Sequence, residues 1–299
     1  MAKKNSFSST CMSDRIFYIL VYGIAIFAFL ITLYPFIYII SVSFSGAQAV
    51  YQGRVTLFPI DFNIAGYKQV FKQDGLWTAY GNTIFYTVVG TIVNIVFTCI
   101  AAYPLSRRSF SARRFLNFFI AFTMYFSGGL IPTYLMITSL GFYNSRLVMI
   151  IPGLISTYNT MICRSAFAGI PDEVIESADI DGANDLQIFF HIAIRLITPT
   201  IAVLVLYYAV GHWNNFFTPL IYMSKEELMP MQVLLRRVLI QSSGELLGNM
   251  DLGGDESTAA ISAQIRYVTI VVATLPILVI YPMLQKYFVK GVMVGAVKG

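Results

Sequence analysis

Residues 170–199 read IPDEVIESADIDGANDLQIFFHIAIRLITP, the one long acidic and polar interruption in an otherwise apolar chain. Six carboxylates fall in this stretch before its first Lys or Arg, which is Arg195. Each of these charges would cost about 3 kcal/mol or more in hydrocarbon, so the stretch cannot lie inside a membrane. We therefore expect a solvated segment. An ordered pattern within it comprises Glu176, Ala178, Asp181, Gly182 and Ala183.

The composition of the 299-residue chain predicts an integral membrane protein. Apolar residues make up 57% and charged residues 12%, against about 25% charge in a soluble domain, and the mean hydropathy is +0.69. Three cysteines and two histidines show no ligand spacing, so neither a disulfide framework, a metal site nor a catalytic site is indicated. The net charge of +5 lies beside apolar stretches, which favours membrane orientation over nucleic-acid binding.

Six apolar stretches are long enough to cross a hydrocarbon core of about 30 Å as helices. They lie at residues 16–40, 82–105, 115–138, 147–169, 199–223 and 267–288. The fourth is the weakest, because Pro152 and Gly153 interrupt it. We predict an all-α integral membrane fold with six transmembrane helices.

Basic residues predict which span ends face the cytoplasm. They gather before the first span, between the second and third, and after the sixth, at Lys3, Lys4, Arg15, Arg107, Arg108, Arg113, Arg114, Lys286, Lys290 and Lys298. Both termini are then cytoplasmic, with tails at 1–15 and 289–299 around a transmembrane domain at 16–288. Loops 41–81 and 224–266 are then external, and the acidic segment is cytoplasmic.

The acidic segment is predicted to form two short helices. Pro171 suits a first helical turn, and Asp172, Glu176 and Asp179 recur at helical spacing as an acidic stripe. Gly182 ends this helix. Asn184 and Gln187 then have the spacing of a capping box that starts a second helix.

The second helix is predicted to be amphipathic. Its shared apolar face would comprise Leu186, Phe189, Phe190, Ala193 and Ile194. This periodicity leaves open a hairpin that lies on the membrane surface.

The segment resembles the EAA loop of permease subunits of ATP-binding-cassette (ABC) importers, in which E-A-A is followed two residues later by D-G-A and an apolar helix ending in prolines. The residues that match are Glu176, Ala178, Asp181, Gly182, Ala183 and Pro199, whereas Ser177 replaces an alanine. Residues 34–45, 212–220 and 286–299 resemble the bacterial carbohydrate branch, which is maltose-transporter-like. Residues 126–134, FSGGLIPTY, resemble the subgroup of these permeases that imports oligosaccharides released from plant or algal polysaccharides.

This resemblance implies an importer-type ABC permease fold in which loop 170–199 carries a coupling helix. Coupling would depend on Glu176, Ala178, Asp181, Gly182, Ala183 and Phe189. The chain has no G-x-x-x-x-G-K-[ST] phosphate loop, so it would bind no cofactor, and ATP and Mg²⁺ would be held by two separate ABC ATPase subunits. The other implied partners are a second homologous permease subunit in a heterodimer, an extracytoplasmic sugar-binding protein and lipid of a bacterial cytoplasmic membrane.

Polar side chains inside apolar spans are costly unless they face a cavity or a partner. Tyr208, His212 and Asn215 recur at i, i+4 and i+7 in the fifth span, and Asn159 lies in the fourth. These four residues are our candidates for contact with a sugar. The alternative is that they bond helices together, which is worth about 0.6–2 kcal/mol for each bond.

The predicted function is that of a non-catalytic permease subunit of an ATP-driven sugar or oligosaccharide importer. A permease for amino acids or peptides is the alternative. An ion-coupled secondary transporter normally carries ionisable groups in mid-span, and these spans hold essentially none. A membrane scaffold or receptor would need no coupling loop.

Overall fold

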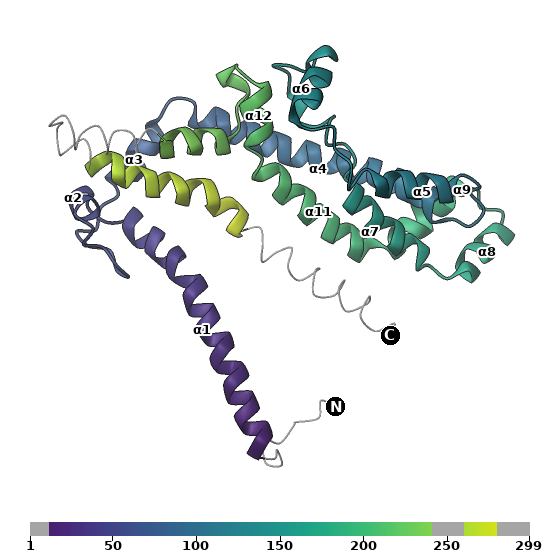
Figure 1. The fold of residues 1–299 in the computed structure, drawn as a ribbon, viewed down its shortest axis with the longest axis horizontal. Helices are drawn as coiled ribbons and strands as arrows, with labels where there is room; N and C mark the ends of the chain where they lie inside the picture. The colour runs from purple at the N-terminus through teal and green to yellow at the C-terminus, as the bar shows by residue number, and fades with distance from the viewer. Residues whose placement is uncertain (1–11, 241–259, 280–299) are drawn as a thin grey trace. The chain divides into compact units, whose positions relative to one another are not determined.

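The computed structural model describes residues 12–240 and 260–279, and in these ranges it is helical and contains no strand. This confirms the all-α prediction. The chain divides into two units, which are Met1–Lys72 with Val238–Val272, and Gln73–Arg237 with Ala273–Gly299. Figure 1 shows the helices of each unit along the chain.

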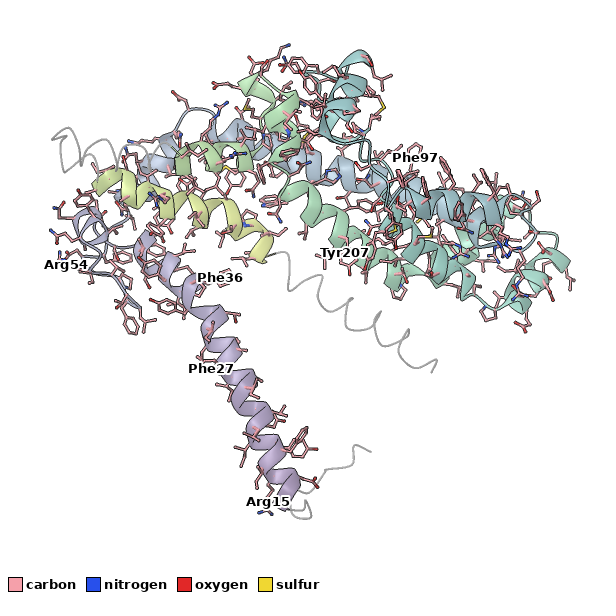
Figure 2. The ribbon with its side chains drawn as sticks, viewed as in Figure 1. Arg15, Phe27, Phe36, Arg54, Phe97 and Tyr207 are labelled. Carbon is pink, nitrogen blue, oxygen red and sulfur yellow. The ribbon has the colours of Figure 1, made fainter. Side chains whose placement is uncertain are left out.

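The first unit begins with a long apolar helix, α1 (Met12–Ser43). Its apolar side chains are exposed along most of its length, and Figure 2 shows Phe27 and Phe36 projecting from the ribbon. A helix that is apolar all round and lacks protein cover is typical of a membrane span.

The end of α1 is held in a compact, hydrogen-bonded turn with α2 (Ala47–Tyr51) and α3 (Ala65–Lys72). Ser45 is fully buried there, and its Oγ donates to Ser41 O over 2.7 Å and accepts from Ile60 N over 3.1 Å. Gln264, from the helix Ala260–Val279, donates to Ser45 O over 2.8 Å. Part of the predicted external loop 41–81 is therefore ordered structure.

The second unit is built around three packed helices, α4 (Leu76–Ser106), α7 (Thr157–Ala168) and α11 (Thr198–Trp213), which lie side by side in Figure 1. Their contact encloses a buried apolar core that includes Ala102, Cys163, Phe167 and Leu204. The unit also contains α5 (Arg113–Phe122), α6 (Leu130–Ser139), η1 (Arg146–Met149), α8 (Asp172–Ile180), α9 (Asp185–Gln187), the π-helix η2 (Ile188–Ala193), α10 (Ile194–Leu196), α12 (Phe217–Tyr222) and η3 (Glu226–Leu228). Residues 231–240 are helical as well.

Three helices within the described residues are long and apolar enough to cross a membrane: α1, α4 and Ala260–Val279. A fourth crossing is formed if Asp185–Leu196 and Thr198–Trp213, which meet at a bend of 79°, count as one span. The part of the sixth predicted span after residue 279 lies outside the described residues. The C-terminal tail and residues 1–11 lie outside them as well.

Three predicted spans are not continuous helices. The stretch 199–223 is interrupted at residues 214–216, between α11 and α12. The stretch 115–138 is broken between α5 and α6, where Gly129 has a φ of +87° that only glycine adopts without strain. The stretch 147–169 is helical only in η1 and α7, and Pro152 with Gly153 lies in the irregular segment between them. The count of six spans stays a prediction.

Candidate functional site

The acidic stripe lies on the exposed side of α8. Asp172, Glu176 and Asp179 are exposed to solvent, as predicted from their spacing. On the opposite side Ala178 is buried, and Val174 and Ile175 pack against the core of the second unit. One face of α8 is therefore anchored, and the other presents carboxylates.

Gly182 ends α8 in a left-handed turn with a φ of +78°. The N–H of Ala183 donates to Ala178 O, and the N–H of Gly182 donates to Asp179 O, both over 3.0 Å. This pair of bonds is a Schellman motif, which places glycine at the left-handed position. A Cβ on Gly182 would meet no atom within 4 Å, so the backbone conformation, and not a steric clash, is what requires glycine.

The capping box predicted at Asn184 is confirmed. Asn184 Oδ1 accepts from Gln187 N, and Gln187 Oε1 accepts from Asn184 N, both over 2.9 Å. The two bonds satisfy backbone donors at the start of α9.

The predicted apolar face of the second helix is wrong in part. Phe189 and Ala193 are buried, but Leu186 and Phe190 are 68% and 56% exposed, and Ile188 is buried in their place. The cause at Ile188 and Phe190 is the π-helix η2, whose wider turn departs from the 3.6-residue period that the prediction assumed.

Phe189 connects the acidic segment to the helix core. Its ring lies 5.0 Å from the Tyr103 ring of α4 and 6.2 Å from the Phe167 ring of α7, measured between centroids. After η2 and α10 the chain bends by 79° into α11, which carries a proline, Pro199, in its first turn. Packed and covalently continuous elements therefore connect α8 with α11.

A cavity of about 640 Å³ lies in the second unit, between α4, α6, α7, α11 and α12. The four predicted path residues, Asn159, Tyr208, His212 and Asn215, all line it. The other polar lining groups are Asn94, Ser127, Thr133, Ser156, Tyr207, Thr218 and Tyr222. No charged side chain of the described residues lines this cavity, so it offers hydroxyls, amides and aromatic rings.

Tyr208 and His212 are both held in hydrogen bonds between helices. The Tyr208 hydroxyl lies 2.7 Å from Thr98 Oγ1 of α4 and accepts from Ser156 N over 3.2 Å. His212 Nε2 lies 2.6 Å from Asn94 Oδ1, and because an amide oxygen only accepts, Nε2 carries the proton. These bonds connect α11 with α4. They agree with the alternative considered from the sequence, in which the polar residues bond helices together.

Asn94 is the centre of the second of these networks. It is fully buried, and its Nδ2 donates to Gly153 O and Leu154 O over 2.7 and 2.8 Å. Those carbonyls belong to the irregular segment before α7. Gly90 lies one turn away, and a Cβ there would come within 2.5 Å of His212 Nε2, so the close approach of α4 and α11 requires glycine. Sequence reasoning missed Gly90, since no local pattern distinguishes it.

Asn159 and Asn215 have polar atoms that remain available to the cavity. Asn159 is 6% exposed, and within the described residues its side-chain amide forms no hydrogen bond. Asn215 Oδ1 accepts from Thr218 N over 3.2 Å, which leaves its NH₂ group as a donor. Across the described ranges, no group of three His, Cys, Asp or Glu residues could hold a metal ion.

Comparison with known proteins identifies the family. Residues 94–294 match the family described as binding-protein-dependent transport system inner membrane component. The polygalacturonan/rhamnogalacturonan transport system permease protein YtcP of Bacillus subtilis is 41% identical over 96% of this chain and 100% of that protein. Protein LplC of the same organism is 42% identical over 90% of each chain.

A solved structure has the same fold. It is a chain of a bacterial ABC transporter involved in the import of the acidic polysaccharide alginate, and it superposes with a TM-score of 0.84 at 36% identity, covering 94% of this chain and 99% of that one. The resemblance inferred from the EAA-like loop is confirmed. The chain belongs to the family of binding-protein-dependent transport system inner membrane components.

Proposed function

We propose that this chain is one of two permease subunits of an ATP-driven importer, and that the pair forms the path of an oligosaccharide delivered by an extracytoplasmic binding protein. The chain is a transport subunit and not an enzyme, and ATP is hydrolysed by a separate subunit. The observation that carries the proposal is the cavity of this chain, whose described lining is uncharged and consists of hydroxyls, amides and aromatic rings. It occurs in a chain that is 41% identical to a polygalacturonan/rhamnogalacturonan permease.

Six membrane passages and cytoplasmic termini are part of the proposal. The proposed domain boundaries are those expected from the sequence, with tails at 1–15 and 289–299, a membrane domain at 16–288 and external loops at 41–81 and 224–266. Breaks in the third and fourth passages are tolerated in a membrane only where irregular backbone is buried in protein or lines a cavity. The irregular segment around Gly153 meets this condition, because Asn94 binds its carbonyls beside the cavity.

Coupling to the ATPase is assigned to α8 and the turn after it. Glu176 and Asp181 are exposed there, and Ile180 is 86% exposed beside them. An apolar side chain flanked by carboxylates would fit a groove on the ATPase that has basic residues at its edges and apolar residues at its centre. Ala178 and Phe189 are buried, so their role would be to fix the exposed groups on the core.

The proposed cargo is an acidic oligosaccharide. One neighbour belongs to an importer of the acidic polysaccharide alginate, and one relative is a polygalacturonan/rhamnogalacturonan permease. In the uncharged cavity, carboxylates of the cargo would meet neutral donors such as the Asn159 and Asn215 amides. Neutral donors hold an anion without trapping it, which suits a path that must also release its cargo.

The test is uptake in cells with and without this chain. We expect labelled oligogalacturonate or oligoalginate to accumulate only when the chain is present and the ATPase subunit keeps its phosphate-loop lysine. Accumulation that survives loss of that lysine but ends with a protonophore would contradict an ATP-driven importer. Uptake of amino acids or peptides alone would support the other importer branch.

Asn159→Ala separates contact with cargo from structural bonding. We expect the half-saturation concentration for transport to rise about tenfold with unchanged membrane yield, because the side-chain amide of Asn159 has no hydrogen-bond partner to lose among the described residues. The matched variant is Tyr208→Phe, which removes a hydroxyl bound to Thr98 and Ser156 and should lower yield or thermal stability instead. The assignment of Asn159 fails if its variant loses yield and keeps the half-saturation concentration.

A further inference from the structure

A second cavity, of about 540 Å³, lies where the end of α4 meets the start of α9 and η2, apart from the proposed sugar path. Its apolar wall includes Ile100, Phe110, Leu186 and Phe190. These four side chains are between 36% and 68% exposed, so an apolar ligand could reach them from outside the chain.

Arg107, the C-cap residue of α4, brings a cation into this cavity. Its guanidinium carbon lies 4.6 Å from the centroid of the Tyr103 ring. Its Nε and Nη2 atoms are buried and have no hydrogen-bond partner in the described part of the chain. Buried cationic donors without an acceptor are costly, so the geometry calls for an anionic oxygen that the described residues do not supply.

Asp185 lines the same cavity and is the one carboxylate there that could serve. It forms no ion pair with Arg107 within 4 Å, and the ion pair found among the described residues joins Arg237 to Glu226. Arg108, Arg113 and Arg114 follow Arg107 without an intervening acidic residue. The cavity lining itself therefore holds one cation, Arg107, and one carboxylate, Asp185, and the three further arginines lie close to Arg107 in the sequence.

We propose that this cavity binds an anionic phospholipid, with its phosphate on Arg107 and an acyl chain along Ile100 and Phe190. The planar guanidinium matches a phosphate with two parallel hydrogen bonds. Basic pockets at the cytoplasmic ends of membrane helices, next to clustered arginines, have the chemistry that recognises anionic headgroups.

A lipid fits this cavity better than a segment of the ATPase does. The cavity combines an exposed apolar wall with one cation at the end of a 31-residue apolar helix, which is the amphipathic profile of a phospholipid at the membrane interface. The surface of α8 that is proposed to contact the ATPase is acidic and would bind basic groups, whereas Arg107 would bind an anion. The inference rests on the proposed cytoplasmic position of the α4–α5 turn.

The bound lipid would join the end of α4 to the segment assigned to coupling. Leu186 and Phe190 lie on that segment, and Ile100 and Arg107 lie on or next to α4. A lipid in contact with both α4 and the coupling segment would resist their separation. An anionic membrane would therefore favour the arrangement in which the coupling segment stays packed near the end of α4.

The test uses the whole transporter complex, purified from membranes containing phosphatidylglycerol and phosphatidylcholine and analysed by native mass spectrometry. The wild type should retain phosphatidylglycerol in preference to phosphatidylcholine. Arg107→Gln should weaken this retention about tenfold, and Arg107→Lys should give an intermediate loss because its charge stays but the planar fork is lost. Arg108→Gln is the matched control, because Arg108 is exposed and does not line the cavity.

The lipid site is wrong if the Arg107 and Arg108 variants lose the same amount of phosphatidylglycerol, or if the wild type retains the two lipids equally. Lipid retention only after removal of the ATPase would instead assign the cavity to the ATPase. Displacement of the lipid by inorganic phosphate alone would also contradict an acyl-chain site. Failure of transport in the same preparation would count against the proposed function, whereas the retained lipid is measured independently of transport.

Discussion

Replacement of Gly182 by valine is expected to reduce ATP-driven uptake at least about tenfold while the chain still inserts into the membrane. Gly182 has a φ of +78°, and the left-handed region costs an ordinary residue about 1–2 kcal/mol and a β-branched one more. The Schellman bonds at Ala178 and Asp179 would open, and the carboxylates of α8 would turn away from their present positions. Uptake and ATPase stimulation in the reconstituted complex measure the effect.

The matched control is Gly182→Asn, because asparagine tolerates the left-handed conformation and a Cβ at this position has open space. We expect this variant to keep most of the uptake. Full uptake and full ATPase stimulation in the valine variant would show that the turn does not transmit the motion.

Asn94→Leu is expected to destabilise the helix core by about 2–4 kcal/mol, the largest loss that we predict for a single buried side chain. The substitution removes the bonds to Gly153 O and Leu154 O and leaves His212 Nε2 without its acceptor. Asn94 is fully buried, so a leucine there would leave these groups unpaired in the interior. The folded yield in detergent and the midpoint of thermal unfolding should both fall.

Thr91→Val is the control on the same helix. Thr91 is 7% exposed, and its Oγ1 is buried without a hydrogen-bond partner in the ranges that the structure describes. Replacing such a hydroxyl by a methyl group of the same shape should be neutral or slightly stabilising. If the two variants lose the same stability, volume and not hydrogen bonding explains the effect at Asn94.

Local features of the acidic segment could be predicted because short-range chemistry determines them. The start of α8 after Pro171, the turn at Gly182 and the capping box of Asn184 with Gln187 each depend on residues within a few positions of one another. The exposed stripe of α8 follows from the helical period alone. These features needed no knowledge of the rest of the chain.

Features that depend on distant residues could not be predicted in the same way. Counting apolar residues gave single spans at 115–138 and 147–169, but both contain breaks, at Gly129 and after Pro152. The carbonyls of the second break are bound by Asn94 of α4, which is about 60 positions away along the chain. The π-helix left Phe190 exposed, because packing of Phe189 and Ala193 on the core overrode the regular period.

All four candidate path residues line the cavity, and their contact with a sugar stays a prediction. Their bonding was not visible in the sequence. Tyr208 and His212 are partners of Thr98 and Asn94, more than a hundred positions away along the chain. Only the folded structure separates these bonded groups from Asn159, whose amide has no partner of its own within the described residues.

The most direct test of the account is a photo-crosslink from position 180 in growing cells. Ile180 is 86% exposed beside the acidic stripe, and Phe62, 72% exposed in the proposed external loop, is the matched control. A photoreactive phenylalanine at position 180 should crosslink to a protein carrying an ABC phosphate loop, identified by mass spectrometry, and the same residue at position 62 should not. If the ATPase is captured from position 62 and not from position 180, the acidic segment is not the cytosolic contact that drives this permease.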